Sequence, residues 1–431
     1  MERRAFFLGA ATAWGAMQVM GANDRVNVAV VGVGGRGKAH VGYYMKISDA
    51  KVAALCDIDT AQMERGNAIV QKAGGEKPKN YQDLRKLYAD KDIDAVSIAT
   101  PNHWHALATI WACQAGKDVY CEKPASYNIF EGNQMVAAAR KYKRMVQIGM
   151  QSRSMDHKIQ AVDRLRNGAI GEVYLAKGLC FKRRPSIGHK DDSPIPPGVD
   201  WDLFLGPAPY RPFNELRFKY NWHWFWDTGN GDIGNQGIHE MDVARWGLGR
   251  DLPMGGVSTG GKYVYHDDQE TPNTQMSTSN YGDAEVMFEV RGLNTGGEAN
   301  IAMSQGPNVI GDIFLGSKGY MSLDDKGFEI FLGDHREPGE ALKSQIPHGG
   351  DTIPHMENFL AAVKSRNYQD LHAEVAIGVA SVKLVHIANI SYRLKRELKW
   401  DPKTEDFHDR EANAMKTRPV YRKPYVVPEK V

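Results

Sequence analysis

Two side chains in this sequence are of types that can move a proton. Lys123 ends the apolar run "DVYCEK", and His239 lies in "NQGIHEMD", where an irregular, glycine-containing stretch becomes helical. Burial can bring the pKa of a lysine toward neutrality, and the helix dipole keeps a first-turn histidine uncharged. The pair could therefore take the proton of an alcohol, although a histidine in this place can also do no more than begin a helix.

A glycine-rich turn offers a site for a dinucleotide. In "VAVVGVGGRG" the residues Gly32, Gly34 and Gly37 have the spacing G-x-G-x-x-G, after a β-branched run and before a helical stretch. Asp57 ends the next predicted strand, 20 residues beyond the third glycine, where an acid binds ribose hydroxyls and repels a 2′-phosphate. The pattern predicts NAD rather than NADP, with Arg36 also at the cofactor, while glycines that only form a turn are the alternative.

More polar residues follow the next predicted strands. Ligands of a doubly wound sheet bind at the carboxyl ends of its parallel strands. By this rule the segments "ATPNHWHA" and "CEKP" contribute four further cofactor-binding candidates, which are Thr100, Asn102, His105 and Glu122. A Glu-Lys-Pro sequence at a strand end is often structural on its own, but the dinucleotide pattern around it favours a chemical role.

Substrate contacts are expected from the later part of the chain. The segment "YNWHWFWD" carries tryptophans at every second position up to Trp226, and aromatic rings suit the apolar faces of sugars. An aromatic strand packed into a core is the more ordinary explanation. Arg153 and Asn235 complete the expected substrate site. The histidines and acids lack the spacing of metal ligands, so we predict no metal site.

The elements that position these residues follow from the apolar pattern. Apolar runs alternate with amphipathic stretches over 25–150, which predicts a doubly wound parallel sheet, a Rossmann domain. Strands close in sequence predict an α/β domain with an open, largely antiparallel sheet over 151–395, followed by a tail over 396–431. A proline-rich, irregular stretch between 184 and 221 is typical of a functional or interface loop.

Composition excludes several classes of partner. The formal net charge is +2, and no basic stripe with interleaved aromatics predicts binding to nucleic acid. After residue 24 no apolar run is long enough to span a membrane. Residues 1–24 place Arg3 and Arg4 before an Ala/Gly-rich apolar stretch, the pattern of a twin-arginine export signal, with a plain N-terminal arm as the alternative. An exported, periplasmic protein would have to carry its NAD with it, tightly bound.

Taken together, "GVGGRG", "ATPNHWHA", "AGKDVYCEKP" and "GIHEMD" resemble the glucose-fructose oxidoreductase, inositol dehydrogenase and MocA family, in particular its exported bacterial branch. The resemblance implies a C-terminal sheet that carries the substrate site and supports homo-oligomers, dimers or tetramers. It also implies that Lys123 and His239 are the catalytic residues. The family pattern Asp-x-Gly-x-His has Asn235 at its first position here.

The sequence thus predicts an NAD-dependent oxidoreductase that moves hydride between a tightly bound nicotinamide and a hydroxyl of a sugar, glycoside or cyclitol. Two other functions are compatible with it. One is a redox-neutral NAD-dependent glycosidase or lyase that acts through a transient keto-sugar, and the other is a non-catalytic dinucleotide- or sugar-binding protein. The intact Glu-Lys-Pro motif favours the oxidoreductase, because that motif looks altered in the NAD-dependent glycosidases of the superfamily.

Overall fold

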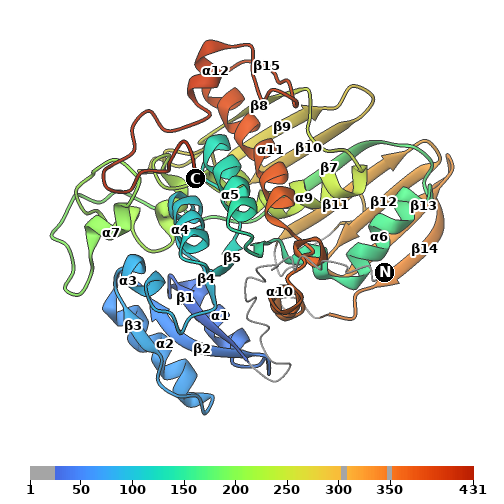
Figure 1. Cartoon of the computed structure of the whole chain (residues 1–431). Helices are drawn as coiled ribbons and strands as arrows, with labels where there is room; N and C mark the ends of the chain where they lie inside the picture. The colour runs from blue at the N-terminus through green and yellow to red at the C-terminus, as the bar shows by residue number, and fades with distance from the viewer. Residues whose placement is uncertain (1–24, 302–307, 347–351) are drawn as a thin grey trace, which may run out of the picture.

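A computed structural model of the chain describes residues 25–301, 308–346 and 352–431. Two sheets organise these residues, one near each end of the cartoon in Figure 1. The predicted export signal over 1–24 lies outside the described residues. The predicted fold class, a parallel Rossmann sheet joined to a largely antiparallel second sheet, is confirmed.

The first sheet has six parallel strands in the order β3-β2-β1-β4-β5-β6. Val28 and Val30 of β1 face one hydrophobic cluster, and Ala29 and Val31 face another, because helices cover both sides. Burial on both faces explains the unbroken apolar runs in the sequence. The strands are β1 (Val26–Val31), β2 (Ala50–Cys56), β3 (Lys79–Tyr81), β4 (Ala95–Ile98), β5 (Asp118–Glu122) and β6 (Val146–Gly149). The helices between them are α1 (Gly35–Tyr44), α2 (Thr60–Lys72), α3 (Leu84–Tyr88), α4 (Asn102–Gln114) and α5 (Ile129–Lys141).

The second sheet has nine strands in the order β14-β13-β12-β11-β7-β10-β9-β8-β15. Only β7 and β10 pair in parallel within it, and the other neighbours are antiparallel. The strands are β7 (Val173–Phe181), β8 (Gly255–Gly261), β9 (Thr274–Asn280), β10 (Glu285–Arg291), β11 (Val309–Gly316), β12 (Gly319–Asp324), β13 (Gly327–Leu332), β14 (Glu337–Lys343) and β15 (Leu398–Lys399). The α-helices of this half are α6 (Asp156–Arg166), α7 (Trp201–Leu205), α8 (Gly231–Asn235), α9 (Gly237–Leu248), α10 (Thr352–Ser365), α11 (Val375–Leu394) and α12 (Arg410–Ala414).

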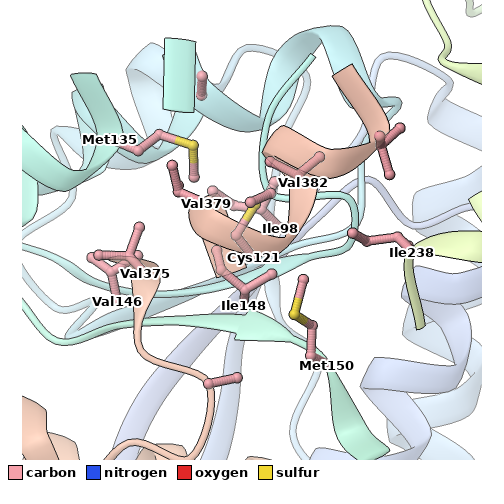
Figure 2. Packing of buried hydrophobic residues seen from close by; sticks show 14 of the residues in the cluster. Ile98, Cys121, Met135, Val146, Ile148, Met150, Ile238, Val375, Val379 and Val382 are labelled. Atoms are coloured by element: carbon pink, nitrogen blue, oxygen red, sulfur yellow. The ribbon is translucent and has the colours of Figure 1, made fainter. Parts of the chain in front are cut away.

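Helix α11 joins the two halves through a common core. Val375, Val379 and Val382 of this helix pack with Ile148 of β6 and with Ile238 at the start of α9 (Figure 2). Gly378 lets the helix approach β6 closely, since a Cβ atom there would come within 2.5 Å of Cγ1 of Ile148. The strand end that carries Lys123 and the helix that carries His239 are thereby held in one packed unit.

Helix α11 is also long and apolar enough, by composition, to cross a membrane. Most of it, 78% of the apolar window, is buried inside the protein, as expected for a core helix. Helix α10 packs its Met356 and Phe359 against the first sheet, although it follows β14 of the second sheet in the chain. A segment from the C-terminal half therefore helps to close the N-terminal half.

Candidate active site

The glycine-rich turn between β1 and α1 has the shape that a dinucleotide phosphate requires. Gly32 has φ +80, and a Cβ atom there would lie 2.8 Å from the backbone of Ala99. A Cβ atom on Gly37 would overlap the carbonyl oxygen of Gly32. Around the ideal Cβ positions of Gly34 and Gly35 the space is open to 4 Å, in front of the N-terminus of α1. The turn is thus tight on its inner side and open where a pyrophosphate would meet the helix dipole.

Asp57 directly follows β2, at the side of this turn. Its carboxylate accepts hydrogen bonds from the backbone N–H groups of Val33, at 2.5 Å, and Asp59, at 2.9 Å. Burial raises the pKa of Asp57 to about 6, against the stabilising effect of these two bonds. The residue lines the same cavity as the glycines, so it can brace the turn and still meet a ribose.

A single cavity of about 720 Å³ runs from the glycine turn to the second domain. Gly32, Gly34 and Asp57 line one part of it, and Lys123 and Asn235 line another. Thr100 and Pro101 at the end of β4 also line the cavity. Its size and its Rossmann location fit an extended dinucleotide with room for a small substrate at the Lys123 end.

Lys123 lies where β5 ends, at the junction of the two halves. Its Nζ donates a hydrogen bond to the backbone carbonyl of Asn235 at 2.6 Å and lies 3.4 Å from Asn235 Oδ1. Burial lowers the pKa of Lys123 to about 8, opposed by the charge of Glu122. An amine with this pKa can hold or release a proton near neutral pH, as the sequence suggested.

Three side chains hold the carboxylate of Glu122, which precedes Lys123 in the chain. Its Oε1 accepts from Arg36 Nε at 2.7 Å, lies 2.9 Å from His40 Nε2, and accepts from Gln151 Nε2 at 3.2 Å. Burial opposes its charge, but Arg36 and His40 hold its pKa well below the usual range. The expected cofactor residues Arg36 and Glu122 therefore form an ion pair that links α1 to β5, and both also line the cavity.

His239 lies in the first turn of α9, as predicted. Burial, with the positive charge of Lys123 as the next cause, lowers its pKa to about 3. The imidazole is therefore neutral at any physiological pH. No side-chain hydrogen bond of this imidazole is found in the described part of the chain, and His239 is not among the residues that line the large cavity, although the charge of Lys123 reaches it.

Asn235, which stands in place of the family aspartate, belongs to a network of polar side chains. Its Nδ2 donates to Tyr220 Oη at 3.0 Å and to Asp232 Oδ1 at 3.2 Å. Arg184 donates to the same Tyr220 oxygen at 2.9 Å and pairs with Asp232 at 2.7 Å. The network thus contains a carboxylate, that of Asp232, which stands one helical turn before the position of the family aspartate.

Sequence reasoning missed Tyr220, Arg184 and Asp232. Asp232 stands three residues before Asn235 in a helical stretch, a spacing that places both on one face and could have been noticed. Tyr220 and Arg184 come from the irregular stretch between β7 and α8, where no periodicity predicts which way a side chain points.

Two of the expected substrate residues are placed elsewhere. Arg153 is buried in a bidentate ion pair with Asp242, with both N···O distances 2.8 Å, and its guanidinium lies 4.8 Å from the ring centre of Trp246. The guanidinium of Arg153, which was expected to bind substrate, is therefore already bound by protein groups. Trp226 lines a second cavity of about 380 Å³, where Arg393 lies 5.1 Å from its ring centre.

Two expected cofactor residues brace the strand ends instead of lining the large cavity. The ring nitrogens of His105 lie 2.7 Å and 2.9 Å from the backbone carbonyls of Pro124 and Thr100, so the histidine ties two neighbouring turns together. Asn102 is buried and donates to Asn230 at 2.9 Å. Within residues 25–301, 308–346 and 352–431, no group of three or more His, Cys, Asp or Glu side chains is arranged to hold a metal.

Comparison with known families matches most of the chain. Residues 26–150 match a model described as "Oxidoreductase family, NAD-binding Rossmann fold". Residues 181–308 and 329–427 match one described as "Oxidoreductase family, C-terminal alpha/beta domain". The prediction of NAD as cofactor is thereby confirmed at the level of the domain.

Individual relatives are more distant. D-glucoside 3-dehydrogenase of Escherichia coli is 25% identical over 52% of this chain and 54% of its own. Inositol 2-dehydrogenase of Salmonella typhimurium is 32% identical over 36% of this chain and 46% of its own. The chain spans about half the length of such curated relatives, or less.

Solved structures agree in fold over nearly their whole length. The WlbA dehydrogenase from Bordetella pertussis, in complex with NADH and UDP-GlcNAcA, superposes with a TM-score of 0.63 at 18% identity. The superposition covers 88% of this chain and 99% of the WlbA chain. Aldose-aldose oxidoreductase from Caulobacter crescentus gives a TM-score of 0.66 at 16% identity, over 87% and 99%.

Proposed function

This chain belongs to the Gfo/Idh/MocA family of NAD-binding oxidoreductases, and on that premise we propose that it oxidises a hydroxyl of a sugar, glycoside or cyclitol, or reduces the matching ketone. One observation carries the proposal. A single cavity connects the dinucleotide turn with Lys123, whose pKa of about 8 suits proton exchange with an alcohol. The sugar and cyclitol dehydrogenases among the relatives support this substrate class.

The residues of the chain then have distinct roles. Bound NAD would supply the hydride acceptor, while Lys123, as a neutral amine, takes the proton of the substrate hydroxyl. The carbonyl of Asn235 holds the amine in place through the 2.6 Å hydrogen bond. His239, which is uncharged, hydrogen-bonds the same hydroxyl and orients it toward Lys123. The alcohol thereby loses one hydride from carbon and one proton from oxygen.

Tight retention of NAD is part of the proposal, and a segment of the second domain supports it. We name residues 184–227, which run between β7 and α8, the strap. Asp200 N–H in the strap donates to the carbonyl of Ile58 at 2.9 Å, and Thr60 N–H donates to the carbonyl of Gly198 at 3.1 Å. Leu203 and Phe204 of the strap line the cavity together with Asp57. A bound adenosine would have to pass these contacts to leave.

The test is a panel of sugars, glycosides and cyclitols given to protein purified without added nucleotide. We expect the purified protein to carry NAD(H). With one class of sugar we expect the nicotinamide absorbance to change and a product of altered mass to appear. Asp57→Ala should be purified without NAD, because the ribose hydroxyls lose their acceptor. Cleavage of a glycoside with no net absorbance change would favour the redox-neutral reaction. If neither the absorbance nor the mass of any sugar changed, the protein would be a non-catalytic binding protein.

Export is a separate proposal, and it rests on Arg3 and Arg4. We expect the full chain to be recovered outside the cytoplasm with NAD already loaded, because the twin-arginine route carries folded proteins. Replacing both arginines by lysine should retain the protein inside the cell, as measured by fractionation and immunoblotting. An unchanged distribution between the fractions would contradict the proposal.

A further inference from the structure

Tyr220 has an unusual hydrogen-bonding position at the Lys123 end of the cavity. Its phenolic oxygen accepts one hydrogen bond from Arg184 Nη1 at 2.9 Å and a second from Asn235 Nδ2 at 3.0 Å. An arginine can only donate, so the first of these bonds has one possible direction. The direction of the second depends on which way the Asn235 amide is turned.

The charges around Asn235 decide that question. Its Oδ1 lies 3.4 Å from the ammonium of Lys123, and its Nδ2 lies 3.2 Å from the carboxylate of Asp232. Turning the amide over would set its oxygen against the carboxylate and its NH₂ against the ammonium, so the present orientation is favoured. The amide therefore donates to Tyr220 as well.

A phenol that accepts twice has only its own proton left to give. Both acceptor positions on Tyr220 Oη are used, and the O–H has no protein acceptor among the residues that the structure describes. Tyr220 lines the cavity with Lys123 and Asn235 and is 50% exposed. Burial of the phenol raises its pKa, so the proton stays on the oxygen at neutral pH. The O–H is thus a fixed donor next to the cavity.

We propose that Tyr220 donates a hydrogen bond to a substrate oxygen, that of a hydroxyl adjacent to the one facing Lys123. This inference rests on the proposed function. Lys123 and Tyr220 contact opposite ends of one carboxamide and line the same cavity, so a sugar or cyclitol whose reacting hydroxyl faces Lys123 would bring its adjacent hydroxyl toward Tyr220. The Arg184–Asp232 ion pair holds the phenol in this orientation, which makes those two residues positioning residues.

The first experiment compares Tyr220→Phe with the unmodified enzyme, both as NAD-loaded protein and on the same sugar. We expect kcat/KM to fall about 10- to 100-fold, because the substrate oxygen loses a donor that is already held in place by Arg184 and Asn235. NAD content should be unchanged. Tyr210→Phe is the matched control, since Tyr210 is 72% exposed in the same strap and should tolerate the change.

The second experiment separates substrate contact from a bracing role. Monodeoxy versions of the active sugar, each lacking one hydroxyl, are assayed with both enzymes. One deoxy sugar should be a poor substrate of the unmodified enzyme, and on that sugar Tyr220→Phe should cause no further loss. If Tyr220→Phe lost the same factor on every deoxy sugar, or lost no kcat/KM on the parent sugar, the inference about Tyr220 would be overturned while the proposed function would stand. Failure of the unmodified enzyme on every sugar would overturn the proposed function and this inference with it.

Discussion

Lys123 is the residue whose ionisation should set the pH dependence of the reaction. Its amine must be neutral to accept a proton, and burial lowers its pKa to about 8. We predict that kcat/KM for sugar oxidation rises about 10-fold per pH unit below pH 8 and then levels off. Ketone reduction needs the protonated amine, so its kcat/KM should be level below pH 8 and fall about 10-fold per pH unit above it. His239, with a pKa of about 3, adds no inflection above pH 5. An inflection near pH 6.5 that disappears in His239→Ala would contradict this assignment.

His239 should nevertheless matter for the rate. Removing its imidazole leaves the substrate hydroxyl without an orienting partner, so His239→Ala should lower turnover about 100-fold or more with NAD still bound. Lys123→Ala should lower turnover at least as much. Turnover is measured by nicotinamide absorbance, and bound NAD is measured after denaturation. If His239→Ala kept normal turnover and only melted at a lower temperature, the histidine would serve just to begin α9.

Asn235 offers a further test of how Lys123 is tuned. A carboxylate at this position would lie near the Lys123 ammonium, which the present Oδ1 approaches to 3.4 Å. Because an opposite charge favours the protonated amine, Asn235→Asp should raise the pKa of Lys123. We expect an active enzyme whose pH profile for sugar oxidation moves to higher pH. A profile that moves to lower pH, or does not move, would show that Asn235 does not face Lys123 in solution.

At the scale of elements, the strap should decide how long NAD stays bound. Gly198 has φ +82 and contacts α2, and a Cβ atom there would come within 2.5 Å of Thr60 Oγ1. Gly198→Ala should therefore lift the strap from β2 and α2. We predict that this variant loses most of its NAD during gel filtration yet turns over when NAD is supplied in excess.

Gly188 provides the matched control for the strap. It also has a positive φ, +69, but nothing lies within 4 Å of its ideal Cβ position. Gly188→Ala therefore shares the backbone strain without the clash against α2, and it should keep its NAD. Equal loss of NAD from both variants would mean that strain in the strap, and not its seat on the first domain, controls release.

At the scale of the whole molecule, the second sheet has one face that no helix covers among the residues that the structure describes. Helices α9 and α11 cover one side of this sheet, as Figure 1 shows. Val257 of β8 and Met276 of β9, on neighbouring strands, are 38% and 49% exposed. Apolar side chains on an open sheet are typical of a contact surface. We propose that copies of this chain assemble through this face.

The corresponding prediction concerns mass in solution. The protein should be a dimer or tetramer by light scattering, and Met276→Glu should shift it toward monomer, because an unpaired charge would be buried in the contact. Met254→Glu is the control, since Met254 is 51% exposed but stands just before β8, at the end of the strand and away from Met276 in the middle of β9. A monomeric unmodified protein, or dissociation by the control change, would contradict the proposal.

The sequence by itself determined the Rossmann fold, the glycine turn with Asp57, the family, and the positions of Lys123 and His239 at element ends. These features depend on local patterns, namely β-branched runs, glycine spacing and a helix start, whose physics acts over a few residues.

Only the tertiary structure decided which polar groups remain available. Arg153 is paired with Asp242, which is 89 residues away, while Asn235 meets Tyr220 and Lys123 from two other segments. Such pairings depend on where α9, α11 and the strap pack, and no residue spacing encodes that. The lost candidate Arg153 and the gained candidate Tyr220 have this one cause, because a polar side chain is free to act only if folding leaves it without a closer partner.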